Sequence, residues 1–152
     1  MELFVIPKGS KFLVQDTKGR LIYTIKKKGF SGKLQLYDAS NYELYTMVSD
    51  FSEKHPSFQI LLNDKLYLWA KCKSRFLDPS LVAEGETGKY LMKSQDREHF
   101  DFFKDDVPCG NITIQQMPNG DTQFHMEIDD KSFDDALPLF TLCIDYSFVK
   151  YK

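Results

Sequence analysis

Hydrophobic and polar residues alternate along most of this chain, in the pattern typical of β-strands that bury one face. The clearest segment runs from Lys65 to Lys73, where Leu66, Leu68, Ala70 and Cys72 alternate with Lys65, Tyr67, Trp69, Lys71 and Lys73. The same period recurs, with polar residues between, in Leu21, Tyr23 and Ile25; in Leu34 and Leu36; in Phe58 and Ile60; in Ile112 and Ile114; and in Phe124, Met126 and Ile128. These segments predict strands with one apolar face.

Turn-forming residues separate the strands. They occur at residues 16–19, 38–41, 63–64 and 117–120, where Asp, Asn, Gly and Pro gather. The pattern predicts twelve strands, near residues 3–6, 11–16, 20–27, 33–38, 42–48, 57–62, 65–73, 76–84, 88–93, 100–103, 110–116 and 121–128. Since no helical stretch lies between these strands, they are expected to be antiparallel rather than joined by parallel crossovers.

The last part of the chain, residues 132–152, departs from this pattern. Between Ala136 and Ile144 only Thr141 carries a polar side chain, which predicts a helix that is surrounded on all sides. Ser132 followed by Asp135 resembles a capping box, and a proline is tolerated only in the first turn of a helix. With Pro138 in that turn, the helix is expected to begin near Asp135.

Either protein or lipid could surround this helix. As a helix, residues 136–149 would span about 21 Å, which is less than the roughly 30 Å of a bilayer core. The segment also includes Asp145. A buried core helix is therefore the preferred interpretation, and a tail that inserts into a bilayer is the alternative.

The number of strands determines the predicted architecture. Closure into a barrel removes the exposed edges of an antiparallel sheet, but a barrel of more than about eight strands leaves a lumen that must be filled. A helix of about 10–12 Å diameter fits such a lumen. We therefore predict a mainly β fold, a closed antiparallel barrel of about twelve strands around the buried C-terminal helix; a two-sheet sandwich with the helix outside is the alternative.

This arrangement resembles the tubby C-terminal-like fold of tubby proteins, phospholipid scramblases and the LURP-one-related family. Local matches are to the last family: FLVQDTKGRLIYTIKKKGFSGKLQLYDASNYELYTMV is similar to its opening, with Asp16, Gly19, Ile25, Lys26, Lys27, Asp38 and Leu44 at the matching positions. FQILLNDKLYLWAKCK, NITIQQMPNGDTQFHMEID and DDALPLFTLCIDY resemble its later segments. The resemblance covers nearly the whole chain, but Gln115 and Gln116 stand where relatives often have a basic pair.

Composition is that of an ordinary globular protein, with 42% hydrophobic and 28% charged residues in 152. A single domain over residues 1–152 is expected. Cys72, Cys109 and Cys143 have no CxxC spacing and are interpreted as reduced, and the N-terminus lacks a leader pattern. These features predict a cytoplasmic protein, in which Cys72 and Cys143 point inward.

Neither a catalytic nor a metal-binding motif is recognisable, and no cofactor is predicted. His55, His99 and His125 lie far apart in the sequence, although His99 and Asp101 could share a metal ion. The aspartates at 129, 130, 134 and 135 could bind calcium, but a helix-capping acidic turn is preferred. An enzyme with a site among the rim loops is kept as an alternative, which would require a pocket with perturbed pKa values.

Lysines supply the candidate binding site. The net charge of −2 does not indicate nucleic acid, yet residues 1–33 carry a balance of +6 and residues 98–135 one of −8. Lys26, Lys27, Lys28 and Lys33 flank the turn Gly29-Phe30-Ser31-Gly32, and Lys8 and Lys11 would extend this group. Tubby proteins bind phosphoinositides and scramblases are membrane-associated, so the resemblance implies contact with anionic phospholipid head groups and a peripheral place at the membrane.

Two alternatives to this site remain open. The lysines could form a solvated loop, leaving a module that binds another protein. Tyr67 and Trp69, beside Lys65, Lys71 and Lys73, form a second candidate surface for lipid or protein.

Overall fold

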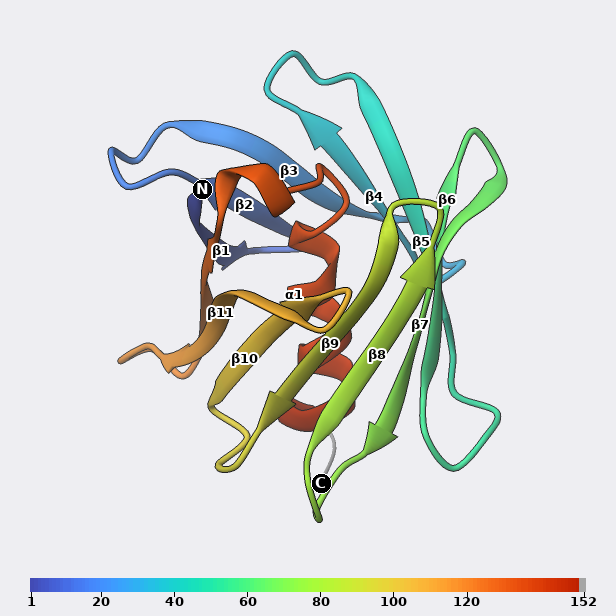
Figure 1. The fold of residues 1–152 in the computed structure, drawn as a ribbon. Helices are drawn as coiled ribbons and strands as arrows, with labels where there is room; N and C mark the ends of the chain where they lie inside the picture. The colour runs from blue at the N-terminus through green and yellow to red at the C-terminus, as the bar shows by residue number, and fades with distance from the viewer. Residues whose placement is uncertain (151–152) are drawn as a thin grey trace.

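A computed structural model describes residues 1–150, which form twelve antiparallel strands and a helical segment (Figure 1). The strands are β1 (Glu2–Lys8), β2 (Lys11–Gln15), β3 (Leu21–Lys28), β4 (Lys33–Asp38), β5 (Glu43–Asp50), β6 (Ser57–Leu62), β7 (Lys65–Ser74), β8 (Ser80–Gly85), β9 (Gly88–Ser94), β10 (His99–Lys104), β11 (Val107–Gln116) and β12 (Thr122–Ile128). Each strand pairs with its neighbours in the chain, and β1 pairs with β12. The sheet therefore closes into the predicted barrel.

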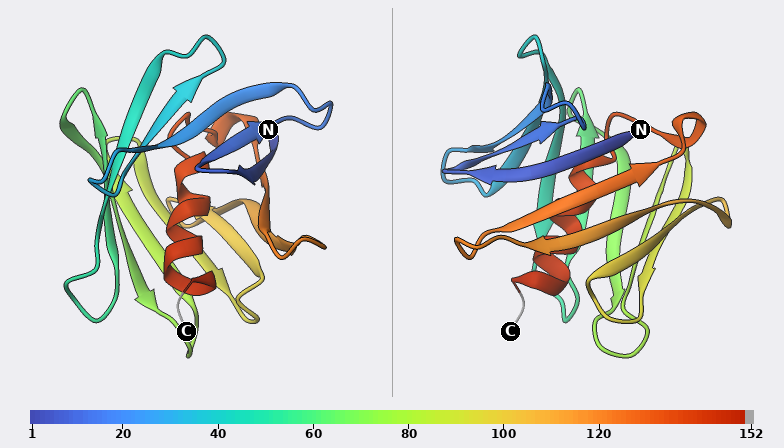
Figure 2. Two further views of the ribbon diagram at one scale, coloured as in Figure 1. Left: turned by 180° about the vertical axis from the view of Figure 1, so that it is seen from behind. Right: turned by 90° about the vertical axis from the view of Figure 1, so that its left-hand side faces the viewer.

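The helical segment lies inside this barrel (Figure 2). It consists of α1 (Pro138–Ile144) and a π-helical continuation, η2 (Asp145–Val149), and follows a 3-10 turn, η1 (Asp130–Ser132). Every residue of α1 is buried. The predicted plug is thus confirmed, and the alternative with the helix outside is wrong.

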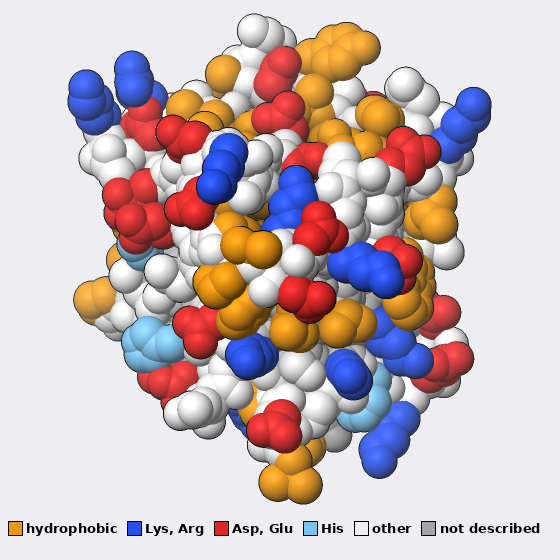
Figure 3. Space-filling model, viewed as in Figure 1, with side chains coloured by type: hydrophobic (Ala, Val, Ile, Leu, Met, Phe, Trp, Pro, Cys, Tyr) orange, Lys and Arg blue, Asp and Glu red, His pale blue; other side chains and the backbone are white. Residues whose placement is uncertain are grey.

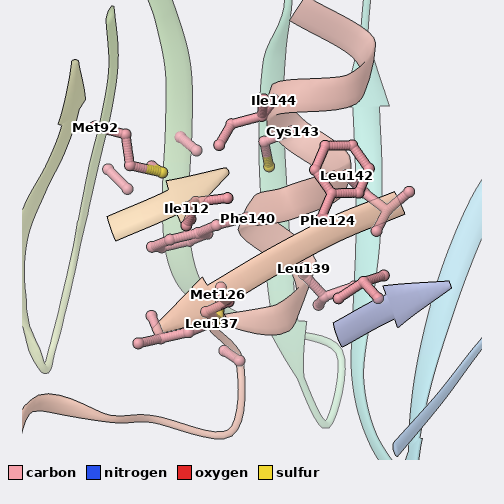
Figure 4. Packing of buried hydrophobic residues seen from close by; sticks show 14 of the residues in the cluster. Met92, Ile112, Phe124, Met126, Leu137, Leu139, Phe140, Leu142, Cys143 and Ile144 are labelled. Carbon is pink, nitrogen blue, oxygen red and sulfur yellow. The ribbon is translucent and has the colours of Figure 1, made fainter. Parts of the chain in front are cut away.

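Apolar side chains from both sides fill the space between sheet and helix. Met92, Ile112, Phe124 and Met126 point from their strands towards α1, as Figure 4 shows. Phe140 of α1 packs against the ring of Tyr90 at a centroid distance of 5.4 Å and against that of Phe102 at 6.1 Å. The strands and the helix therefore contribute side chains to one continuous hydrophobic core.

The start of the helix differs from the prediction. Ser132 ends the 3-10 turn and does not cap α1, which begins at Pro138 with Leu137 as its N-cap residue. Proline has no N–H to donate and its φ suits the first helical position, so Pro138 determines where the α-helix starts. The prediction of a start near Asp135 was wrong by three residues.

Asp134 and Asp135 instead attach the segment before the helix to the barrel rim. The hydroxyl of Tyr67 donates to Asp134 Oδ2 at 2.5 Å, and the hydroxyl of Tyr23 donates to Asp135 Oδ1. Asp134 Oδ1 also accepts from the backbone N–H of Ala136 at 2.8 Å. We call these four residues, Tyr23, Tyr67, Asp134 and Asp135, the rim latch.

Two strands depart from the predicted pattern. Ile60 and Leu61 are consecutive in β6, but their partners in β7 are Leu68 and Leu66. Tyr67 between these partners is therefore an extra residue, which forms a β-bulge. As a result Leu66 is 56% exposed rather than inward, whereas Leu68, Ala70 and Cys72 are buried as predicted. Strand β8 begins at Ser80 and not near residue 76, because residues 75–79 form an irregular bend between β7 and β8.

Candidate functional site

The lysine-rich ends of four neighbouring strands meet on the outside of the barrel. Lys8 pairs with Lys11, Lys11 with Lys26, and Lys28 with Lys33 across β1, β2, β3 and β4. Val5, Phe12, Ile25 and Leu34 face the core on β1, β2, β3 and β4 respectively. Because side chains alternate along a strand, residues one or three positions away from them face outward. We call the resulting set the basic face: Lys8, Lys11, Lys26, Lys28 and Lys33.

The turns of this region lie close together. Figure 2 shows the β1–β2 and β3–β4 turns at the same edge of the barrel, in agreement with the pairing of their flanking lysines. Lys26 Nζ lies 4.9 Å from the centre of the Tyr37 ring and 3.5 Å from Asn41 Oδ1. Among residues 1–150, no ion pair involves a lysine of the basic face. Lys28 and Lys33 line a cavity of about 430 Å³ that also includes Glu43 and Asp64. Lysines that are not held in ion pairs are available to attract anions.

Lys27 lies apart from the other predicted lysines. It follows the inward Ile25 by two positions, so it lies on the inner face at the mouth of the barrel. There it lines a cavity of about 290 Å³ together with Lys150, Asp145, Phe12 and Phe124. The structure thus brings Lys26, Lys28 and Lys33 together with Lys8 and Lys11, and directs Lys27 elsewhere.

An aromatic side chain stands at the tip of the basic face. Phe30 is 111% exposed, at the end of the β3–β4 turn. Gly29 and Gly32 adopt left-handed φ values of 53° and 74°, and Ser31 Oγ donates to the carbonyl oxygen of Lys28 at 2.6 Å. The turn was recognised in the sequence but its aromatic residue was not, although a bulky apolar residue between glycines and lysines was a readable signal.

The second predicted surface is divided by the structure. Tyr67 belongs to the rim latch, while Trp69 is 38% exposed on the outer face of β7. Lys71 pairs with Glu53, with Nζ and Oε2 3.6 Å apart. Tyr67 and Trp69 therefore do not form one aromatic surface with the neighbouring lysines.

The acidic residues before the helix have separate partners. Asp130 pairs with the N-terminal ammonium group of Met1, and Asp134 and Asp135 belong to the rim latch.

His99 lies beside Asp96, with its Nδ1 atom 2.7 Å from Asp96 Oδ2. Hydrogen bonds from the backbone N–H groups of His99 and Glu98 lower the pKa of Asp96.

Two cavities are relevant to the alternative that this protein is an enzyme, which would require a pocket with perturbed pKa values. At the barrel mouth, burial raises the pKa of Asp145, and Lys150, with Nζ 3.3 Å from Asp145 Oδ2, opposes this shift. A larger groove of about 560 Å³ on the outer surface is lined by Lys73, Ser80, Lys93 and Asp101. Burial also raises the pKa of all three cysteine thiols, which disfavours the reactive thiolate.

Charges elsewhere on the surface are mixed in sign. Figure 3 shows acidic and basic side chains interspersed around hydrophobic ones on the side that carries β8, β9 and β10. None of the helices within residues 1–150 has both the length and the apolar content that a membrane span requires. The basic face is distinguished by five lysines at the adjoining ends of neighbouring strands and by Phe30.

An antiparallel barrel closed around its own apolar helix places this protein among plugged-barrel domains. The chain belongs to the LURP-one-related family, whose family model matches residues 1–144. This confirms the resemblance to the LURP-one-related family that the sequence showed. Among solved structures, an X-ray structure of a protein from Arabidopsis thaliana is similar, with 13% identity and a TM-score of 0.41 over 94% of this chain and 86% of that chain. No curated protein matches the chain.

Proposed function

We propose that this protein is a non-catalytic binding domain whose basic face contacts anionic phospholipid head groups at a membrane surface. The observation that carries the proposal is the full exposure of Phe30 at the tip of a turn flanked by Lys28 and Lys33. Phe30 is the most exposed of the large hydrophobic side chains within residues 1–150. A protruding aromatic side chain flanked by lysines suits a membrane surface, where anionic head groups lie above an apolar layer.

The expected energies favour reversible attachment. Withdrawing a phenylalanine side chain from water contributes roughly 1.5–3 kcal/mol, and each lysine near an anionic membrane contributes about 1 kcal/mol. Phe30 with the five lysines of the basic face would therefore support peripheral binding that weakens with salt. Such binding needs no passage through the barrel, whose interior is occupied by α1.

Three further features support a binding role over catalysis. The buried Asp145 carboxyl group is paired with Lys150, the three thiols are buried, and the helix fills the lumen where small molecules bind in open barrels. The resemblance to membrane-associated tubby and scramblase proteins points the same way. The membrane surface that fits this proposal is the cytoplasmic leaflet, where anionic lipids are concentrated.

Vesicle flotation tests the proposal. The protein is expected to float with phosphatidylserine-containing vesicles at low salt, to remain unbound with phosphatidylcholine alone, and to be released by salt. Replacing Lys11, Lys28 and Lys33 by Glu should abolish flotation, and Phe30→Ser should weaken it about tenfold or more, the equivalent of 1.4 kcal/mol.

A matched variant controls for net charge. Lys18 lies in the β2–β3 turn, Lys65 begins β7 and Lys89 is the second residue of β9. All three are exposed and none belongs to the basic face, so replacing them by Glu changes the net charge equally. Flotation that is lost equally in both triple variants, or absent from every vesicle, would discard the lipid proposal and leave a protein partner for this surface.

A further inference from the structure

Three potential metal ligands meet on the outside of the seam that closes the barrel. Glu2 lies on β1, and His125 and Glu127 lie on β12, with their ligand atoms all within 4.8 Å of one another. We propose that this site, the seam site, binds a divalent transition-metal cation of the zinc class. Glu2 begins β1 and Lys8 of the basic face ends it, so the two sites lie at opposite ends of that strand. The seam site is independent of the proposed lipid contact.

The strand register brings the two carboxylates together. Glu2 and Glu127 are direct cross-strand partners, and like charges in that position destabilise a sheet. His125 precedes Glu127 by two residues and so projects from the same face of β12. Its Nε2 atom lies 2.6 Å from Glu2 Oε2. A divalent cation between these groups would neutralise both carboxylates at once.

The imidazole is already oriented for this role. The His125 ring stacks on that of Phe4, its cross-strand partner, at a centroid distance of 4.8 Å and an interplanar angle of 24°. The His125 side chain is 19% exposed and that of Glu2 is 40% exposed, so solvent reaches one side of the site. Rigid paired strands hold all three ligands, and the solvent side leaves coordination positions for water.

The donor set selects the class of metal. One imidazole nitrogen with carboxylate oxygens suits zinc and its neighbours, whereas Mg²⁺ and Ca²⁺ prefer oxygen donors alone. In a tetrahedral site with bonds of about 2.0–2.2 Å, the ligand atoms lie about 3.3–3.6 Å apart. The three atoms here, all within 4.8 Å of one another, would have to draw towards this spacing. The distance of 2.6 Å between His125 Nε2 and Glu2 Oε2 would also have to lengthen.

A second group, Asp96, Glu98 and His99, is less available to a metal. Asp96 Oδ1 already accepts hydrogen bonds from the backbone N–H groups of Glu98 and His99, each at 2.8 Å. Its other oxygen contacts His99. Substitution of His99 in this group therefore serves as a control for substitutions in the seam site.

Calorimetric titration of the chelator-treated protein with Zn²⁺ tests the inference. One ion per chain is expected, with Mg²⁺ giving no heat of specific binding. Because the ion would join the first and last strands, Zn²⁺ should also raise the thermal midpoint in proportion to the logarithm of its free concentration. His125→Ala should weaken binding by more than about tenfold, since even outer-shell substitutions cost about 10–100-fold.

Further variants keep the result interpretable. Glu127→Gln keeps the shape of the side chain and should also weaken binding, while His99→Ala should leave it unchanged. If His125→Ala does not fold, Glu127→Gln and a zinc-induced shift of the His125 imidazole NMR signals decide the question. Absence of binding, binding unaffected by Glu127→Gln, or binding lost with His99→Ala would each overturn the seam site.

Discussion

The role of a single side chain here depends on its place in the two-residue alternation of a strand. Lys26 and Lys28 lie on the outer face, whereas Lys27 between them reaches the barrel mouth. Identical residues in one run therefore belong to two different environments. The sequence predicted the run as a unit, and only the inward position of Ile25 separates its members.

Gly85 is a residue-scale prediction. It pairs with Leu68, beside the bulge at Tyr67, and an added Cβ would lie 2.2 Å from the Tyr67 carbonyl oxygen. Because backbone rather than a flexible side chain occupies that space, Gly85→Ala should lower the free energy of unfolding by about 1–3 kcal/mol. Urea denaturation measures this, with the exposed neighbour Glu86→Ala expected to change stability by less than about 0.5 kcal/mol. An unchanged midpoint for Gly85→Ala would show that the strands separate easily here.

At the scale of elements, the helix is positioned as much by the segment before it as by its own sequence. The rim latch joins this segment to β3 and β7 through two tyrosine hydroxyl groups. The β7 bulge is what directs Tyr67 towards Asp134. Sequence periodicity could not predict this contact, because a bulge reverses the alternation and depends on the register of the neighbouring strand.

The rim latch predicts a pH dependence. Burial, followed by the hydrogen bonds to Asp135 and Asp134, raises the pKa of Tyr23 and of Tyr67 above the ordinary value of about 10. The neutral hydroxyl groups are therefore favoured by folding, and their contribution is complete below pH 10 and declines as the pH rises above it. Denaturation of the wild type and of a Tyr23→Phe, Tyr67→Phe variant should show a stability difference that is constant at neutral pH and narrows as the pH rises above about 10. A constant difference would indicate that the hydroxyl groups do not stabilise the latch.

For the whole molecule, the helix and the barrel form one core and should unfold together. Phe140 contacts Tyr90 and Phe102, and both α1 and the inward faces of the strands are buried. Neither part can bury its apolar surface alone, which is the physical basis of a single cooperative transition.

The substitution Phe140→Ala tests whether the helix and the barrel unfold together. Removing the fully buried ring should lower the free energy of unfolding by about 3–5 kcal/mol, with far-UV and near-UV circular dichroism changing at the same denaturant concentration. Phe30→Ala makes the same chemical change at a fully exposed position and should alter stability by less than about 0.5 kcal/mol. Two separate transitions for Phe140→Ala would mean that the barrel is stable without its plug.

The amino-acid sequence alone determined the strands, their antiparallel order, the buried helix and the family, because alternation, turn residues and an unbroken apolar run are local properties of the chain. Tertiary structure decided which distant residues meet: Lys8 with Lys11 and Lys26 on one outer face, Tyr67 with Asp134 at the rim, and Glu2 with His125 and Glu127 at the closing seam. These contacts depend on strand register and on closure between β1 and β12, which are set by the packing of the whole barrel around α1.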